Sequence, residues 1–280
     1  MDKTEVSIII PAYNEAPTIG DLVLRTKSIH PDFEIIVVND GSTDDTAAIA
    51  RDAGAHVHSH PYNIGNGAAI KSGIRIAKGD ILVFMDGDNQ HDPEDIVKLL
   101  KYMPDYDMVV GARSRGDQAS LGRAFGNTIY ISDLTSGFRA IKADIARDFL
   151  FLLPNTYSYP TTLTLGVLRT GRSVKYVPIR IHKRKRGKSK ISLFRDGVRF
   201  FMIITKICTL YSPMRIFLPV SFIMFILGFI YYCYTFFMSG RFTNMSALLF
   251  TTSVLIFMMS LISEQICQMR FDRNDGDNIS

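Results

Sequence analysis

The sequence predicts an α/β fold with a doubly wound, mainly parallel sheet, followed by interface helices and a hairpin of two transmembrane helices. In the first two thirds of the chain, short apolar runs alternate with helical patterns, which is typical of strands joined by helical crossovers. Three of these runs end in polar loops that carry carboxylates. Near the C-terminus, two apolar stretches are free of charge and long enough to span a bilayer, which needs about 20 residues.

Charge is divided unevenly along the 280 residues. Residues 1–181 contain 19 Lys and Arg against 22 Asp and Glu, whereas residues 182–280 contain 13 against 5. The net acidic N-terminal region argues against nucleic-acid binding there, and the basic C-terminal region suits an anionic membrane surface. The three cysteines, Cys208, Cys233 and Cys267, lie in or beside apolar segments without metal-ligand spacing, which indicates a reducing compartment.

Strands and helices are expected to alternate along the N-terminal region. The apolar runs that predict strands are bounded by Gly, Pro, Asn and Asp, and the loops before helices offer Ser, Thr or Asp as caps. The expected strands are 6–10, 34–38, 55–58, 81–85, 108–111 and 174–181. Helices are expected to begin near Thr18, at a cap on Ser42 or Thr43, after the glycine-rich loop 63–68 and near Pro93, with a last one over 157–170.

The loop that follows strand 81–85 carries the clearest chemistry. Asp86 and Asp88 come directly after the strand, Gly87 lets the backbone bend between them, and Gln90 adds an amide oxygen. Such hard oxygens suit Mg²⁺ or Mn²⁺, which complete their coordination shells with waters and substrate phosphates. An acidic turn followed by a helix cap explains the same loop when it is considered alone.

The loops after strands 6–10 and 34–38 are also polar, and they contribute Glu15 and Asp40. The carboxyl ends of parallel strands share one edge of the sheet, where ligands bind in open α/β folds, so we expect these carboxylates to meet. Together the three loops fit a nucleotide site, with Asp40 accepting from the base or ribose and a metal at the third loop holding a diphosphate. Each loop by itself also fits ordinary turn chemistry.

Four motifs carry a resemblance to a known family: PAYNE at 11–15, VVNDGSTDDT at 37–46, NxGxG at 63–67 and DGDNQ at 86–90. The region 6–141 resembles a family 2 glycosyltransferase with the GT-A nucleotide-sugar fold. The resemblance implies a GDP- or UDP-linked sugar donor and a divalent metal on Asp88, with Asp86 and Gln90 nearby. The residues that it places against the donor nucleotide are Pro11, Tyr13, Glu15, Asp40, Gly67, Asp86 and Gly87.

DLTSGFR at 133–139 resembles the acceptor-side motif of the polyprenyl-phosphate branch of this family. Upstream of it, Arg113, Arg115 and Arg123 suit phosphates, although we expect at least one of them only to face solvent. Nine residues separate Arg123 from the motif, fewer than the helical insertion expected in that branch. The residues expected to act in catalysis are Asp88, Arg113, Asp133 and Arg139, and those expected on the acceptor phosphate are Arg113, Ser136, Arg139 and Lys188.

Six Lys and Arg residues fall within 183–190, and three explanations of this cluster are open. It fits a solvated loop, a nucleic-acid contact or attraction to anionic lipid, and the residues that follow favour lipid. Over 193–207 a helical pattern puts Arg195, Arg199 and Lys206 on one stripe of an otherwise apolar helix, as at a membrane interface. The RGKSK run in the cluster resembles the segment that covers the active site in the polyprenyl-phosphate branch.

Residues 216–238 and 244–263 contain no charge and predict two membrane spans. Two buried core helices are the alternative, which the length and all-round apolarity of the segments disfavour. Basic residues on both flanks put both chain ends on the cytoplasmic side. Gly228 offers one point of close helix approach, so a homo-oligomer is a further expectation. The expected division is a catalytic domain at 1–182, a basic loop and interface helix at 183–213, transmembrane helices at 214–268 and a cytoplasmic tail at 269–280.

A membrane-anchored enzyme with a cytosolic metal and diphosphate site is expected to join a soluble donor to a lipid acceptor. We expect an inverting, metal-dependent transfer of a sugar, mannose or glucose, to a polyprenyl phosphate. A polysaccharide synthase with the same donor fold is one alternative, but the chain contains no Trp for its QxxRW motif and offers only two spans. A membrane-anchored binding or scaffold protein without turnover is the other alternative, and the intact metal motif argues against it.

Overall fold

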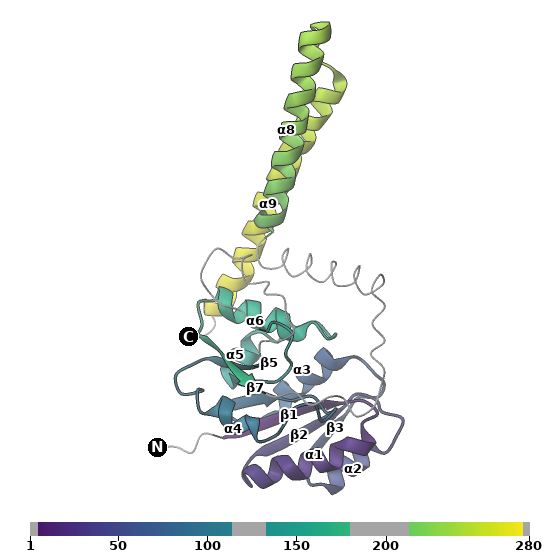
Figure 1. Cartoon of the computed structure of the whole chain (residues 1–280), viewed down its shortest axis with the longest axis vertical. Coiled ribbons are helices and arrows are strands. Elements are labelled where there is room, and N and C mark those ends of the chain that lie inside the picture. Colours follow the sequence, from purple (N-terminus) through teal and green to yellow (C-terminus); the bar gives the residue numbers. More distant parts are fainter. Residues whose placement is uncertain (1–4, 114–132, 180–212, 277–280) are drawn as a thin grey trace. The chain divides into compact units, whose positions relative to one another are not determined.

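The computed structural model of the chain describes residues 5–113, 133–179 and 213–276. These residues belong to two compact units, Met1–Ser189 and Lys190–Ser280. The first unit contains a sheet covered by helices, and the second contains two long helices (Figure 1). The basic cluster at 183–190 and the interface helix expected at 193–207 lie outside the described residues.

A mixed, mostly parallel sheet forms the centre of the first unit. Its described strands are β1 Val6–Ala12, β2 Glu34–Asn39, β3 His56–Ser59, β4 Ile81–Phe84, β5 Met108–Arg113, β6 Arg139–Lys142 and β7 Val174–Ile179. They are arranged in the order β3-β2-β1-β4-β6-β5-β7, and only β6 runs antiparallel to its neighbours, β4 and β5, among these strands. The predicted doubly wound, mainly parallel fold is confirmed.

Helices cover both faces of this sheet, so β1, which lies inside it, is buried along its whole length. The helices are α1 Ala16–Ile29, α2 Thr46–Asp52, α3 Asn66–Ile76, α4 Asp95–Leu100, α5 Ala143–Asp148 and α6 Tyr159–Arg169. Ile8 and Ile10 of β1 belong to the hydrophobic core formed with α1, α2 and α4. Ile9 points to the other face, toward α3, where its side chain would meet a Cβ on Gly73.

One strand, β6, is absent from the sequence-based prediction. It has only four residues, begins with a charged one and follows a loop, so no alternating or continuous apolar pattern marks it. Its first residue, Arg139, is nevertheless fully buried, and it pairs with Phe84 of β4. The expected helix starts also shift: α1 begins at Ala16 rather than Thr18, and α4 begins after Pro93 instead of at it.

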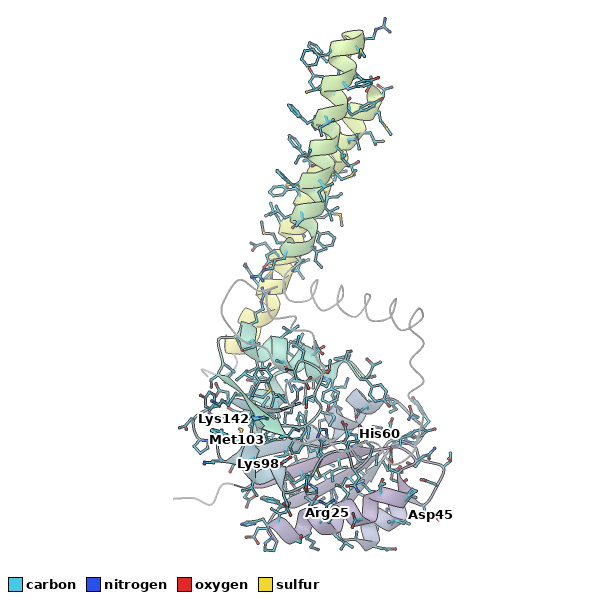
Figure 2. All side chains as sticks on the ribbon, in the orientation of Figure 1. Arg25, Asp45, His60, Lys98, Met103 and Lys142 are labelled. Carbon is cyan, nitrogen blue, oxygen red and sulfur yellow. The ribbon has the colours of Figure 1, made fainter. Side chains whose placement is uncertain are left out.

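The second unit is a pair of helices, α8 Met214–Ser239 and α9 Asn244–Gly276, joined by a short turn in which Gly240 has φ of 60°. Both contain segments long and apolar enough to span a membrane, Met214–Met238 and Asn244–Met269. Their apolar side chains project outward along both helices (Figure 2). In the most apolar stretch of 18 residues, only 11% of the residues are buried in α8 and 17% in α9. Such a surface is typical of helices that face lipid rather than a protein core.

Small residues form the contact between α8 and α9. The buried positions recur every seven residues along each helix, which is the repeat of a left-handed antiparallel coiled coil. At the centre, the hydroxyls of Ser221 and Ser253 each donate to the other residue's carbonyl oxygen over 2.9 Å. A Cβ on Gly228 would lie 3.1 Å from the Cβ of Leu249, so this glycine lets α8 pack closely against α9 within the hairpin. The buried residues are Ser221, Gly228 and Thr235 in α8, and Ser246, Ser253, Ser260 and Cys267 in α9.

At the opposite edge of the sheet from the carboxylate-bearing loops, Asp107 joins three strands. Its Oδ1 accepts from Lys142 Nζ at the end of β6 over 2.9 Å. Its Oδ2 accepts from the backbone N–H and the hydroxyl of Ser173, just before β7, each over 2.9 Å. Burial opposes ionisation of this carboxyl, but these donors outweigh it and hold the pKa of Asp107 below its ordinary value.

We expect Asp107→Asn to lower the free energy of unfolding at pH 7 by about 1–2 kcal/mol, because hydrogen bonds to a charged acceptor are lost. Since the folded pKa is the lower one, the carboxylate stabilises the fold above about pH 4 and loses this effect as the pH falls through the folded value. The deficit of the variant should therefore shrink between pH 7 and pH 3. Thermal unfolding of the full-length protein, monitored by circular dichroism at each pH, measures the difference in unfolding free energy between the variant and the wild type. Asp105→Asn, at an exposed position two residues earlier, is the matched control, and an equal loss there would contradict this role.

Candidate active site

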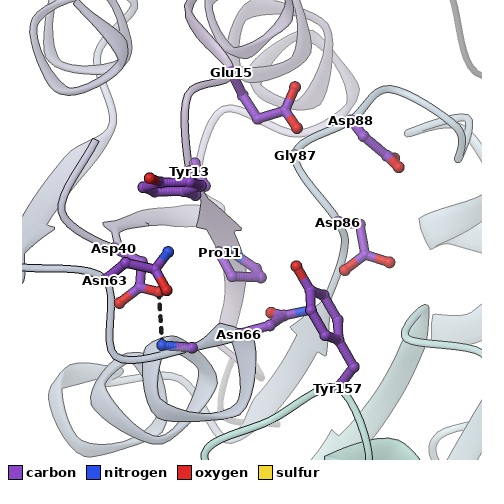
Figure 3. Close-up of a pocket in the computed structure, with 12 residues that line it drawn as sticks. Pro11, Tyr13, Glu15, Asp40, Asn63, Asn66, Asp86, Gly87, Asp88 and Tyr157 are labelled. Carbon is purple, nitrogen blue, oxygen red and sulfur yellow. Dashed lines mark hydrogen bonds between the residues drawn. The ribbon is translucent and has the colours of Figure 1, made fainter. Parts of the chain in front are cut away.

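A pocket of about 390 Å³ lies at the carboxyl ends of β1, β2 and β4. The expectation that the three carboxylate-bearing loops meet at one edge of the sheet is confirmed. In Figure 3, Glu15, Asp86 and Asp88 lie on one side of the pocket and Asp40 on the other. The lining residues are Pro11, Ala12, Tyr13, Glu15, Asp40, Asn63, Gly65, Asn66, Asp86, Gly87, Asp88 and Tyr157.

The loop after β4 is held by α1. The hydroxyl of Thr18, in the first turn of α1, donates to the carbonyl oxygen of Gly87 over 3.1 Å. Farther along α1, Arg25 Nη2 donates to Asp92 Oδ1 over 2.7 Å. Between these anchors, the backbone N–H of Gln90 donates to Asp88 Oδ1 over 3.2 Å. Asp86 and Asp88 therefore project from a fixed turn into the pocket, whereas Gln90 is not among the residues that line it.

The acidic side of the pocket has the donor set of a hard-cation site. Asp86 and Asp88 supply carboxylate oxygens, and Glu15 lies on the same side of the pocket (Figure 3). Within the described part of the chain, no three His, Cys, Asp or Glu side chains converge closely enough to form a complete site. An ion held by Asp86 and Asp88 would therefore take further oxygens from a bound diphosphate and water, as Mg²⁺ and Mn²⁺ commonly do.

Asp40 forms the opposite wall and also shapes the loop beside it. The carboxylate is only 3% exposed, and it accepts from the backbone N–H groups of Ile64 over 3.0 Å and Gly65 over 2.8 Å (Figure 3). A third donor is the ring of His60, whose Nδ1 lies 2.7 Å from Asp40 Oδ1. Tyr13, about half exposed, stands between Asp40 and the acidic side.

The glycines of the NxGxG motif leave room for another loop. A Cβ on Gly65 would lie 2.3 Å from the carbonyl oxygen of Asn155, and one on Gly67 would lie 2.1 Å from that of Pro154. The N–H of Ala68, in the first turn of α3, also donates to the Asn155 oxygen over 3.3 Å. Gly67 therefore packs against residues 154–156 and is not among the residues lining the pocket, and its expected contact with a nucleotide stays a prediction from the sequence.

Tyr157 is a pocket residue that the sequence did not single out. It follows the loop packed against the NxGxG glycines, and its ring enters the pocket from that side with 81% of its surface exposed (Figure 3). In the sequence it stands only at the start of a predicted helix. No local pattern marks it, because its place depends on the contact between residues 154–156 and residues 65–68.

Arg139 does not reach the pocket, contrary to the expectation that it binds a phosphate directly. Its side chain is fully buried. Nη1 donates to the Pro160 carbonyl oxygen over 2.9 Å and to Thr164 Oγ1 over 3.0 Å, and Nη2 donates to the Ser136 carbonyl oxygen. Burial lowers the pKa of Arg139, and the nearby Asp86 is among the groups that oppose this shift.

The polar side chains of the DLTSGFR loop are also engaged internally. Asp133 Oδ1 accepts from the N–H groups of Thr135 and Ser136, over 3.0 and 3.1 Å. The Ser136 hydroxyl, which was expected on the acceptor phosphate, donates to the Gly111 carbonyl oxygen over 2.6 Å. A Cβ on Gly137 would lie 2.9 Å from Asp86 Oδ2. The loop therefore buttresses the carboxylate of the expected metal motif.

Several expected acceptor-side groups fall outside the described part of the structure. Arg113 ends β5, but its side chain is not described. Arg115, Arg123 and Lys188 lie in the ranges 114–132 and 180–212, which are not described either. Their roles remain expectations from the sequence.

Two family models match the chain. Residues 7–157 match glycosyl transferase family 2, and residues 212–269 match the GtrB C-terminal hairpin. The first match covers every loop that lines the pocket, and the second covers most of the two long helices.

Curated proteins with similar sequences include two transferases. One is an undecaprenyl-phosphate mannosyltransferase of Micrococcus luteus, 30% identical over 67% of this chain and 87% of that protein. Another is an undecaprenyl-phosphate 4-deoxy-4-formamido-L-arabinose transferase of Pseudomonas savastanoi pv. phaseolicola, 31% identical over 80% of this chain and 71% of that one. Among solved structures, the fold is similar to glucosyl-3-phosphoglycerate synthase of Mycobacterium tuberculosis, with a TM-score of 0.61 and 22% identity over 73% of this chain and 79% of that one.

We expect Gly67→Ala to destabilise the wall that carries Tyr157. The new Cβ would meet backbone oxygens, so residues 154–156 must move, and overpacking of this kind costs about 1–3 kcal/mol. The midpoint temperature of thermal unfolding should fall, and amide hydrogen exchange should become faster in the peptide that contains residues 154–158. Gly20→Ala is the control, because its Cβ would meet only a side-chain methyl group, Ile49 Cγ2, at 2.8 Å. Wild-type stability and exchange in Gly67→Ala would contradict the packing role.

Proposed function

This chain belongs to glycosyl transferase family 2, and from that premise we propose that it transfers a sugar from a nucleoside diphosphate to a polyprenyl phosphate in the membrane. The observation that carries the proposal is the shared pocket of Asp40, Asp86 and Asp88. At one end of the pocket, the buried carboxylate of Asp40 can accept a hydrogen bond from a nucleoside. At the other end, Asp86 and Asp88 can hold a metal ion that binds the diphosphate. The lipid acceptor is proposed from the two undecaprenyl-phosphate transferases to which the chain is similar.

On the donor side, Asp40 would accept a hydrogen bond from the base or ribose, and Tyr13 would offer a ring beside it. Asp86 and Asp88, with Gln90 nearby, would hold Mg²⁺ or Mn²⁺. When bound, such an ion neutralises charge on the diphosphate that leaves. Glu15 is linked to this loop through Thr18, whose hydroxyl lies 3.3 Å from Glu15 Oε2 and 3.1 Å from the carbonyl oxygen of Gly87.

In the proposed reaction, a phosphate oxygen of the lipid attacks the anomeric carbon of the sugar. The bond from that carbon to the diphosphate oxygen breaks, the electron pair leaves with the nucleoside diphosphate, and the configuration inverts. A phosphate monoester, with a second pKa near 6, is already mostly dianionic at neutral pH, so no strong general base is required. Arg113 and Lys188 are the proposed contacts of the acceptor phosphate, while the buried Arg139 positions the loop against Asp86.

The two apolar C-terminal helices make this a membrane protein, and we propose that they anchor the transferase domain with both chain ends in the cytoplasm. The basic residues before the first span and after the second support this topology. The proposed division remains 1–182, 183–213, 214–268 and 269–280. The sugar is proposed to be mannose or glucose, delivered from GDP or UDP.

A lipid-linked sugar assay tests the proposed function. Membranes with the full-length protein receive Mn²⁺ or Mg²⁺, undecaprenyl or dolichyl phosphate, and a panel of labelled GDP- and UDP-sugars. We expect label to enter the organic phase, and we expect Asp88→Asn to reduce the transfer by about 100-fold or more because a metal ligand in the pocket is lost. Removal of the metal with EDTA should have the same effect.

The matched control is Glu94→Gln, since Glu94 is an exposed carboxylate in the same loop but outside the pocket. Its activity should stay within about twofold of the wild type, as expected for a surface substitution. No transfer from any donor in the panel, by a protein that still binds nucleotide, would overturn the proposal.

A further inference from the structure

A buried chain of polar groups extends from the pocket wall to α3. Asp40 Oδ1 lies 2.7 Å from His60 Nδ1, and His60 Nε2 lies 2.9 Å from Ser72 Oγ. The histidine, labelled in Figure 2, is only 9% exposed, and it follows β3 at the same edge of the sheet as the pocket. The roles assigned to the pocket residues so far leave this histidine and serine without a function.

In the neutral ring, one arrangement of hydrogens satisfies both contacts. Asp40 can only accept when it is ionised, so Nδ1 of His60 must carry a hydrogen. In the neutral ring Nε2 is then an acceptor, and the Ser72 hydroxyl donates to it. Asp40 thus fixes the tautomer, and the serine hydroxyl, which donates to Nε2, holds the ring in place.

The donors around Asp40 use most of its accepting capacity. A carboxylate offers about four lone-pair sites, and three are taken by His60 Nδ1, Ile64 N and Gly65 N. The remaining site belongs to Oδ2, and Asp40 lines the pocket. His60 and Ile64 both hold Oδ1 and Gly65 holds Oδ2, so the carboxylate has little freedom to turn where it lines the pocket.

We propose that His60, held by Ser72, is a positioning residue that orients Asp40 to recognise the nucleoside of the donor. This inference rests on the proposed function. Although the order of groups resembles a catalytic triad, Ser72 lies within α3 and is not among the pocket residues, so the group presented to the ligand is the carboxylate. His60 therefore acts on the affinity for the nucleoside, at the end of the pocket away from the diphosphate.

Two substitutions separate the contacts of the ring. In His60→Asn the amide nitrogen takes the place of Nδ1, so the hydrogen bond to Asp40 is kept and the one to Ser72 is lost. In His60→Gln the amide reaches the place of Nε2, so the contact with Ser72 is kept and the one with Asp40 is lost. His58→Gln is the matched control, because this ring packs edge-on against His60 at 5.7 Å but does not bond to Asp40.

The measurement is calorimetric binding to the full-length protein in lipid nanodiscs, with UDP, GDP and inorganic diphosphate as probes, each with Mn²⁺. We expect His60→Gln to raise the Kd of the nucleotide that the wild type binds by about tenfold, as for a lost hydrogen bond to a charged group. The Kd of inorganic diphosphate should not change. His60→Asn should stay within about threefold of the wild type for every probe, and His58→Gln should match the wild type.

Turnover provides a second measurement: His60→Gln should raise KM for the sugar donor and leave kcat nearly unchanged. Equal weakening of nucleotide and diphosphate binding would show a merely structural role and overturn the inference, as would wild-type affinities in His60→Gln. A wild type that binds neither UDP nor GDP would instead overturn the proposed function, and this inference with it.

Discussion

Negative charge gathered at one edge of the sheet is the constraint on which the rest of this domain depends. Glu15, Asp40, Asp86 and Asp88 line a single pocket, where like charges repel one another. On the neighbouring strand β6, Arg139 is fully buried, and Tyr159, Tyr176, Asp133 and then Asp86 oppose the lowering of its pKa by burial. Burying a guanidinium is costly unless opposite charges and hydrogen bonds compensate. Here the oxygens of Pro160, Thr164 and Ser136 accept hydrogen bonds from the guanidinium, and Asp133 and Asp86 supply opposite charge nearby.

The antiparallel strand β6 brings together the motifs proposed for the donor and for the acceptor. Because Arg139 pairs with Phe84, the loop before β6 arrives beside the loop after β4. Gly137 then packs against the carboxylate of Asp86, and a Cβ at this position would lie 2.9 Å from Oδ2, so the carboxylate would have to shift. An acceptor-side motif thus supports the carboxylate proposed to hold the metal of the donor. A change in this loop acts on the metal motif through contact rather than through a ligand.

The second unit relies on close packing of small residues. In lipid the hydrophobic effect does not drive two apolar helices together, so van der Waals contact and hydrogen bonds between helices must hold them. The reciprocal bonds between Ser221 and Ser253, and the space at Gly228, meet this need. The outward faces remain apolar, as an anchor for a lipid-directed enzyme requires.

The sequence by itself determined the fold class, the convergence of three carboxylate loops and the two apolar helices, because residues close together in the chain indicate each of these features. Periodicity marks buried strands and helices, and the carboxylates stand next to strand ends in the chain. Tertiary structure alone decided that β6 exists, that Tyr157 enters the pocket, that Gly67 packs against residues 154–156 and that Arg139 is buried. It also placed His60 and Ser72 behind Asp40. These features depend on which segments distant in the chain come into contact, and no local pattern records the close approach of residues 154–156 to a glycine or the pairing of a four-residue strand that begins with arginine.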